Sequence, residues 1–210
     1  MAERVLVDPY VTLPQQREAA VMGMYVFLGS EIMLFGGLFV VALALRLLHP
    51  QEVVEASKHL HLWIGGINTA VLLTSSFAVA LAVHAAGAGA RRSAMILLLI
   101  AAALGVAFLG IKAFEYSKEY DEGMLPAFGE TTHFANPVER LFMDLYLIST
   151  ALHALHVTVG VMLLGGVATS IGRRWIVLPT RSIVVENSGL YWHLVDAIWI
   201  FLYPVLYIVR

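Results

Sequence analysis

The chain has 210 residues, of which 60% are hydrophobic and 13% are charged, and its formal net charge is −2 at neutral pH. Soluble domains carry about a quarter charged residues, so this composition predicts an integral membrane protein, and the scattered basic residues predict no nucleic-acid partner. Because the sequence has no cysteine, it excludes disulfides, thiolate-bound iron–sulfur clusters and a thiol nucleophile.

Five segments are long and apolar enough to cross a bilayer core of about 30 Å, which needs roughly 20 residues of helix. They are residues 19–46, 62–86, 93–114, 141–171 and 189–209. The predicted fold class is therefore all-α, a polytopic membrane helix bundle that forms a single domain over residues 1–210. Short arginine-bearing loops usually stay in the cytoplasm. The second and fourth loops carry such arginines, which predicts the N-terminus inside and the C-terminus outside.

Glu31 lies in the middle of the first segment, and residues 19–45 contain no other charged side chain. Lipid cannot solvate a carboxylate, so Glu31 must have partners inside a bundle or be protonated. We expect it to stay protonated at neutral pH. Its candidate roles are a structural hydrogen bond, the movement of protons, or the binding of a polar group of a lipid or a neighbouring subunit.

The other segments also contain polar side chains at membrane depth. The candidates are Asn68, Ser75, His153, His156, His193 and Asp196. Spacings of three and seven residues place them in pairs on shared helix faces, so hydrogen bonds between helices are expected to hold the bundle in register. Two alternatives are haem ligation by the histidines and a divalent metal site made by Glu31, His153 and His156.

The third loop, residues 115–140, is rich in acidic side chains and is interpreted as an acidic segment on the outer face that contacts another protein. Lys112 and Glu115 are three residues apart at its start. They are expected to form a local pair or to reach the membrane interface.

Aromatic residues gather near the predicted helix ends, as in the interfacial belts of membrane proteins. Trp63 and Trp192 belong to this group of interfacial aromatics. Trp199 is grouped with them but lies deeper, so it is expected to pack against other helices.

The sequence lacks the Walker loop, the G-x-S-x-G elbow, the H-E-x-x-H pair and the dinucleotide fingerprint. It therefore predicts a subunit of a larger assembly with no catalytic residue and no metal site of its own.

Five stretches resemble the haem-copper oxidase subunit III family, the family of cytochrome c oxidase subunit III. They are FLGSEIMLFGGLF closed by Arg46, INTAVLLTSSFAVALAVHAA with His84, GIKAFEYSKE, STALHALHVTVG and YWHLVDAIWIFLYPVLYIV. They occur in the family's order from Tyr25 onward. The chain is similar to the five-helix bacterial form, which lacks the two extra N-terminal helices of the seven-helix form.

This resemblance implies a multi-pass, non-redox subunit in a bacterial plasma membrane that packs directly against subunit I. The haems and copper are then expected in partner subunits, with subunit II and a small subunit IV as further partners. The family supports proton uptake, protects the enzyme from inactivation during turnover, and has been proposed to offer a route for oxygen. In the seven-helix form phospholipid fills a cleft, which would be incomplete here. The resemblance therefore leaves open whether phospholipid binds near Glu31, Arg46 and His84.

Cytochrome c is the expected electron donor of such a complex, and a quinol oxidase is the alternative within the family. An accessory membrane subunit of a nitric oxide reductase shares the same helices. A free-standing haem b cytochrome or a small transporter is a further alternative.

Overall fold

The structure, a computed structural model, describes residues 12–58, 60–122 and 136–208. In this part the chain forms six helices and no strand. They are α1 (Leu13–Leu48), α2 (Pro50–Lys58), α3 (Leu62–Gly87), α4 (Arg91–Asp121), α5 (Pro137–Gly172) and α6 (Ser182–Tyr207). All but α2 are long and apolar enough to cross a membrane. The all-α fold class and the five predicted crossings are therefore confirmed.

At most of their ends the helices extend beyond the predicted apolar segments. The third crossing continues to Asp121 and the fifth begins at Ser182, because polar turns at helix ends do not contribute to hydropathy. Local capping sets two of the starts. The Thr12 hydroxyl accepts a hydrogen bond from the backbone N–H of Gln15 at 3.3 Å, and Asn136 Oδ1 accepts one from Val138 at 3.0 Å. Such side chains satisfy N–H groups that have no partner within the helix.

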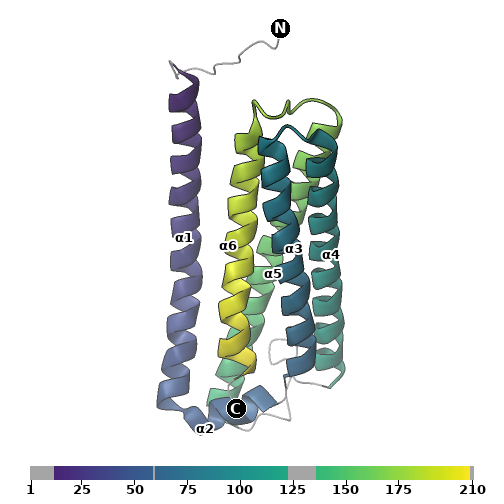
Figure 1. The fold of residues 1–210 in the computed structure, drawn as a ribbon. Helices are drawn as coiled ribbons and strands as arrows, with labels where there is room; N and C mark the ends of the chain where they lie inside the picture. Colours follow the sequence, from purple (N-terminus) through teal and green to yellow (C-terminus); the bar gives the residue numbers. More distant parts are fainter. Residues whose placement is uncertain (1–11, 59, 123–135, 209–210) are drawn as a thin grey trace.

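Helices α3 to α6 form an antiparallel bundle, and α1 lies along one side of it (Figure 1). Among the described residues, α1 contacts α2, α5 and α6 but neither α3 nor α4. The start of α1 and the end of α6 lie at opposite ends of the bundle. Which end faces the cytoplasm stays a prediction.

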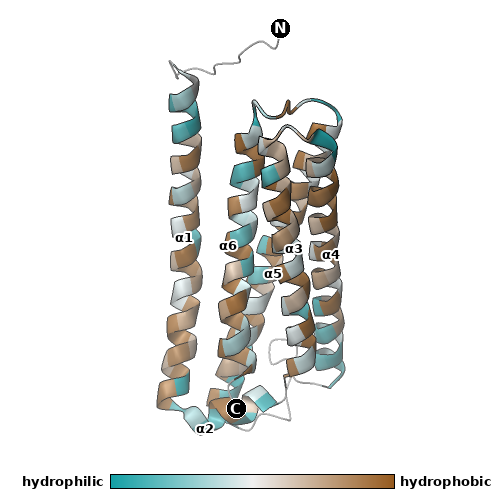
Figure 2. Ribbon diagram, viewed as in Figure 1, coloured by the Kyte–Doolittle hydropathy of each residue, from teal (hydrophilic) through white to brown (hydrophobic). Residues whose placement is uncertain are grey.

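Hydrophobic residues predominate along the helices, and hydrophilic residues lie at the helix ends and at several points along α6 (Figure 2). Large hydrophobic side chains are exposed on every crossing, including Met33, Phe77, Val106, Met162 and Phe201. The interior, in contrast, contains buried charged and polar groups such as Lys112, Glu115 and Asp196. This arrangement fits a lipid environment, in which polar side chains turn toward the protein interior.

Arg91, expected in the second loop, begins α4 and joins it to the end of α5. Its Nε donates to the carbonyl oxygen of Ile171 at 2.8 Å, and its Nη2 donates to that of Gly172. Carbonyl groups in the last turn of a helix have no partner within that helix. Arg91 therefore caps α5 and holds the arginine-bearing ends of α4 and α5 together.

Trp192 lies between two glycines of neighbouring helices. A Cβ added at Gly105 of α4 would lie 2.6 Å from Trp192 Cη2, and one added at Gly160 of α5 would lie 2.7 Å from Trp192 Cε3. Only glycine leaves room for the indole at these two points. Trp192 is fully buried, so it packs in the interior, and its predicted place in an interfacial belt is wrong.

We expect Gly105→Ala and Gly160→Ala each to destabilise the protein by about 1–3 kcal/mol, because the added methyl groups overpack the Trp192 site. Gly110→Ala on α4 is the matched control, since a Cβ there meets no atom within 4 Å. The measurement is thermal unfolding in detergent followed by circular dichroism. Equal stability of the Gly105→Ala and Gly110→Ala variants would contradict the packing described for Trp192.

Candidate functional site

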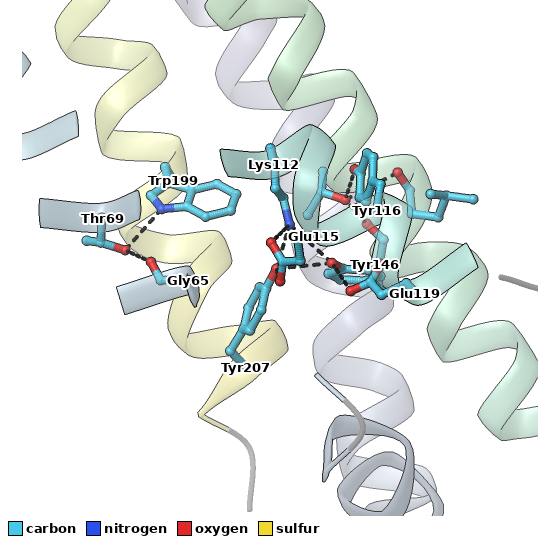
Figure 3. Close-up of polar contacts among 11 residues, drawn as sticks. Gly65, Thr69, Lys112, Glu115, Tyr116, Glu119, Tyr146, Trp199 and Tyr207 are labelled. Atoms are coloured by element: carbon cyan, nitrogen blue, oxygen red, sulfur yellow. Dashed lines mark hydrogen bonds and ion pairs between the residues drawn. The ribbon is translucent and has the colours of Figure 1, made fainter. Parts of the chain in front are cut away.

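Lys112 of α4 lies at the centre of a buried polar network near the end of the bundle at which α6 ends (Figure 3). Its Nζ donates hydrogen bonds to Glu115 Oε2 at 2.9 Å, to the Tyr146 hydroxyl at 3.1 Å and to the Tyr207 hydroxyl at 2.6 Å. The three partners belong to α4, α5 and α6. A single ammonium group therefore joins three helices.

The two tyrosines pass these hydrogen bonds on to carboxylates. The Tyr146 hydroxyl donates to Glu119 Oε1 at 2.8 Å, and the Tyr207 hydroxyl donates to Glu115 Oε1 at 2.9 Å. Both glutamates are fully buried. Each tyrosine hydroxyl thus accepts a hydrogen bond from Lys112 and donates one to a carboxylate, which is the arrangement that a hydroxyl group can satisfy.

Aromatic rings surround the same ammonium group. The ring centroids of Tyr116, Tyr146, Trp199 and Tyr207 lie 5.0–5.4 Å from Lys112 Nζ. Their faces stabilise a cation by electrostatic attraction. The network compensates the buried charge with hydrogen bonds, ion pairing and aromatic rings together.

This arrangement corrects the interpretation of the third loop as a wholly outer acidic segment. Glu115 and Glu119 lie on α4 and face the interior, so they are not available to another protein. Lys112 pairs locally with Glu115, but it is buried and does not reach the interface. The part of the predicted segment at 123–135 lies outside the described residues.

A second polar contact joins α1 to α5 near the middle of both helices. Glu31 Oε2 lies 2.8 Å from His156 Nε2, and each side chain is 14% exposed. The other ring nitrogen, His156 Nδ1, lies 2.8 Å from the carbonyl oxygen of Leu152. Because a carbonyl can only accept, Nδ1 must carry a hydrogen. The Glu31–His156 contact therefore needs one further proton, carried by the carboxyl group or by Nε2.

The environment of this pair is partly aromatic. The Phe35 ring meets the His156 ring edge-on, with centroids 5.3 Å apart. The Tyr191 hydroxyl donates to the backbone carbonyl of His156 at 3.0 Å. Glu31 thus has a partner inside the protein, as its position requires. The protonation expected for Glu31 remains a prediction, because two placements of the shared proton satisfy the geometry.

The other predicted candidates are distributed over separate places. His193 Nδ1 lies 2.7 Å from the Ser76 hydroxyl, in a contact between α6 and α3. Asn68, His153 and Asp196 are buried in the bundle. His84 is exposed near the end of α3 and does not join the Glu31 site.

His153 and His156 are three residues apart but contact different groups. The His153 ring stacks on Trp199, with centroids 5.0 Å apart, whereas His156 contacts Glu31 of α1. The metal site weighed for these three ionisable residues is therefore not formed. Among the described residues, no group of three or more His, Cys, Asp or Glu side chains gathers as a candidate metal site.

Trp63 and Trp199, both grouped with the predicted interfacial aromatic residues, differ in their burial. Trp63 is 82% exposed at the start of α3, where an interfacial residue would lie. Trp199 is fully buried, and its Nε1 donates to the Thr69 hydroxyl at 3.0 Å, so it is a packing residue and not an interfacial one.

The tyrosines of the Lys112 network were not among the predicted site residues. A signal was present in α4, where the buried residues Phe108, Lys112, Glu115 and Glu119 follow one another at spacings of four, three and four. This is the period of a single helix face. It indicated that the charged residues continue the buried stripe of the helix.

Comparison with known proteins agrees with this architecture. The family model described as cytochrome c oxidase subunit III matches residues 14–210. The chain belongs to the cytochrome c oxidase subunit III family. Its Lys112 network, its Glu31–His156 pair and all five crossings lie within the matched range. It is accordingly a multi-pass membrane protein and a subunit III of a haem-copper oxidase.

Three relatives illustrate the range of this family. The chain is 34% identical to cytochrome c oxidase subunit 3 of Thermostichus vulcanus, over 90% of this chain and 86% of the relative. It is 31% identical to cytochrome c oxidase subunit 3 of Synechocystis sp., over 89% and 74%. It is 28% identical to quinol oxidase subunit 3 of Bacillus subtilis, over 90% and 86%. Membership alone therefore does not decide the electron donor.

We expect Lys112→Met to destabilise the protein by about 3–5 kcal/mol, because it leaves buried carboxylates without their cation. Lys58→Met is the matched control, since Lys58 pairs with Glu55 at the same three-residue spacing but both side chains are more than half exposed. Its expected cost is about 0–1 kcal/mol. The measurement is the free energy of unfolding in mixed micelles, and equal losses in the two variants would contradict the role assigned to the network.

Proposed function

We propose that this chain is the non-redox subunit III of a proton-pumping terminal oxidase that reduces oxygen to water with electrons from cytochrome c. The observation that carries the proposal is the family match over residues 14–210. The two cytochrome c oxidase relatives, at 34% and 31% identity, support cytochrome c as the donor. The Bacillus subtilis relative at 28% makes a quinol oxidase the second candidate.

In this proposal the chain supports the redox subunits and holds no redox centre itself. It packs directly against subunit I, and the haems and copper lie in partner subunits. Subunit II and a small subunit IV complete the complex, which lies in a bacterial inner membrane with phospholipid around the bundle. The apolar outer surface of every crossing supports contacts with lipid and with other membrane helices.

The Lys112 network and the Glu31–His156 pair suggest how the chain contributes to the complex. Both link helices through hydrogen bonds between side chains, so they hold the bundle in one arrangement. A rigid subunit stabilises the surface of its neighbour. We propose that the chain supports proton uptake and protects the enzyme during turnover in this structural way.

The test of the function is purification of the tagged chain from native membranes in mild detergent, followed by mass spectrometry, a visible spectrum and oxygen-uptake assays. We expect a haem- and copper-bearing subunit to co-purify, and we expect reduced cytochrome c to sustain oxygen uptake. Uptake with a quinol alone would replace cytochrome c by a quinol as the donor. Recovery of a nitric oxide reductase would overturn the proposal.

We expect Glu31→Ala to leave the haem content of the purified complex unchanged, because Glu31 contacts His156 of the same chain. It should lower the stability of the subunit or the rate of proton uptake, since it leaves His156 Nε2 without its partner. The measurements are the haem-to-protein ratio from the visible spectrum and proton uptake by stopped flow. Loss of haem from an otherwise assembled complex would contradict a structural role for Glu31.

A further inference from the structure

Several buried polar atoms have no hydrogen-bond partner among the described residues, and three side chains of the bundle interior have two such atoms each. They are the amide of Asn68, both ring nitrogens of His153 and both carboxyl oxygens of Asp196. Their exposed fractions are 0%, 0% and 3%. The Ser76 hydroxyl lies beside Asp196. Its hydrogen bond, however, is with His193 Nδ1, at 2.7 Å.

These three side chains come from three helices but lie at similar depth. The Trp199 indole connects the helices, since it donates to Thr69 of α3 and stacks on His153 of α5. Asn68 directly precedes Thr69, and Asp196 lies one turn before Trp199 on α6. With 3.6 residues per turn, all three therefore lie within about one helical turn of the same level.

Buried polar groups left without hydrogen bonds are strongly unfavourable, and the lipid around the bundle offers none. The ligand that meets these groups must both donate and accept, because an amide and an imidazole each present donors and acceptors. It must also be small, because His153 is packed against the rings of Phe108 and Trp199. A cation would neutralise the carboxylate of Asp196, but it could not accept hydrogen bonds from the N–H groups of Asn68 and His153.

We propose that Asn68, His153 and Asp196 form a binding site for internal water molecules between α3, α5 and α6. Water donates and accepts hydrogen bonds and bridges buried polar groups of this kind. The Ser76–His193 contact lies beside Asp196 and is partly exposed, so it lies between the site and the surface of the bundle.

Two aromatic rings beside the site can report on its water. Phe108 and Trp199 are fully buried, and their ring centroids lie 5.5 Å and 5.0 Å from that of His153. Hydroxyl radicals made by X-ray radiolysis of bound water oxidise side chains next to that water. Phe142 is 1% exposed and lies in the same hydrophobic core, so it is the matched control.

The experiment is radiolytic footprinting of the intact complex purified through this chain, with mass spectrometry of the oxidised residues. We expect oxidation of Phe108 and Trp199 to exceed that of Phe142 at least threefold. Oxidation no higher than that of Phe142 would overturn the proposal.

Variants separate water binding from general looseness of the bundle. The double variant Asn68→Leu with Asp196→Leu should lower oxidation of Phe108 at least threefold, whereas Asp196→Asn should retain it. Ser75→Ala is the control substitution, because the buried Ser75 hydroxyl already donates to the carbonyl of Ala101 at 3.0 Å. Unchanged oxidation in the assembled double variant would count against the site.

A measurement on the unaltered complex keeps the proposal testable even if the double variant fails to assemble. A cryo-electron microscopy map that resolves ordered water elsewhere in the subunit should show density within hydrogen-bonding distance of Asn68, His153 and Asp196. A map of that quality without such density would overturn the proposal.

Discussion

The hydrogen bonds of the Lys112 ammonium group determine how α4, α5 and α6 meet. A lysine inside a bilayer has no water to solvate it, so the protein must provide both its counter-charge and its acceptors. Glu115, Tyr146 and Tyr207 do so from three helices, and the two tyrosines are 34 and 95 positions away from the lysine in the sequence. Moving any one of these helices along its axis would leave a buried donor or acceptor unpaired. The network therefore defines the vertical register of the bundle.

The Glu31–His156 contact defines the position of α1 along α5, as the Lys112 network defines the register of α4, α5 and α6. Helix α1 contacts α5, α6 and the short α2, so much of its surface lies outside the protein. Apolar contacts between membrane helices are hardly stronger than contacts with lipid, and they define position along the axis poorly. An acid at membrane depth that finds its partner at a single point supplies the positional specificity that apolar packing lacks.

The five crossings could be predicted because long apolar runs are the direct signature of a helix in lipid. Hydropathy did not predict where the helices end. Lys112 and Glu115 interrupt the apolar run, so the predicted third crossing ends at residue 114, although the helix continues to Asp121. Their burial depends on tyrosines from two other helices, which hydropathy does not describe.

For the candidate site, the sequence identified which residues need partners but not which partners they have. Glu31 and His156 were both candidates, yet they are 125 residues apart and meet only through the packing of α1 on α5.

The separation of Glu31 and His156 in the sequence also affects biosynthesis. At 5–20 residues per second, about 6 to 25 s pass between the synthesis of Glu31 and that of its partner. During this interval α1 carries an unpaired acid, so lipid headgroups, water at the insertion machinery or a partner helix must accommodate it until α5 arrives.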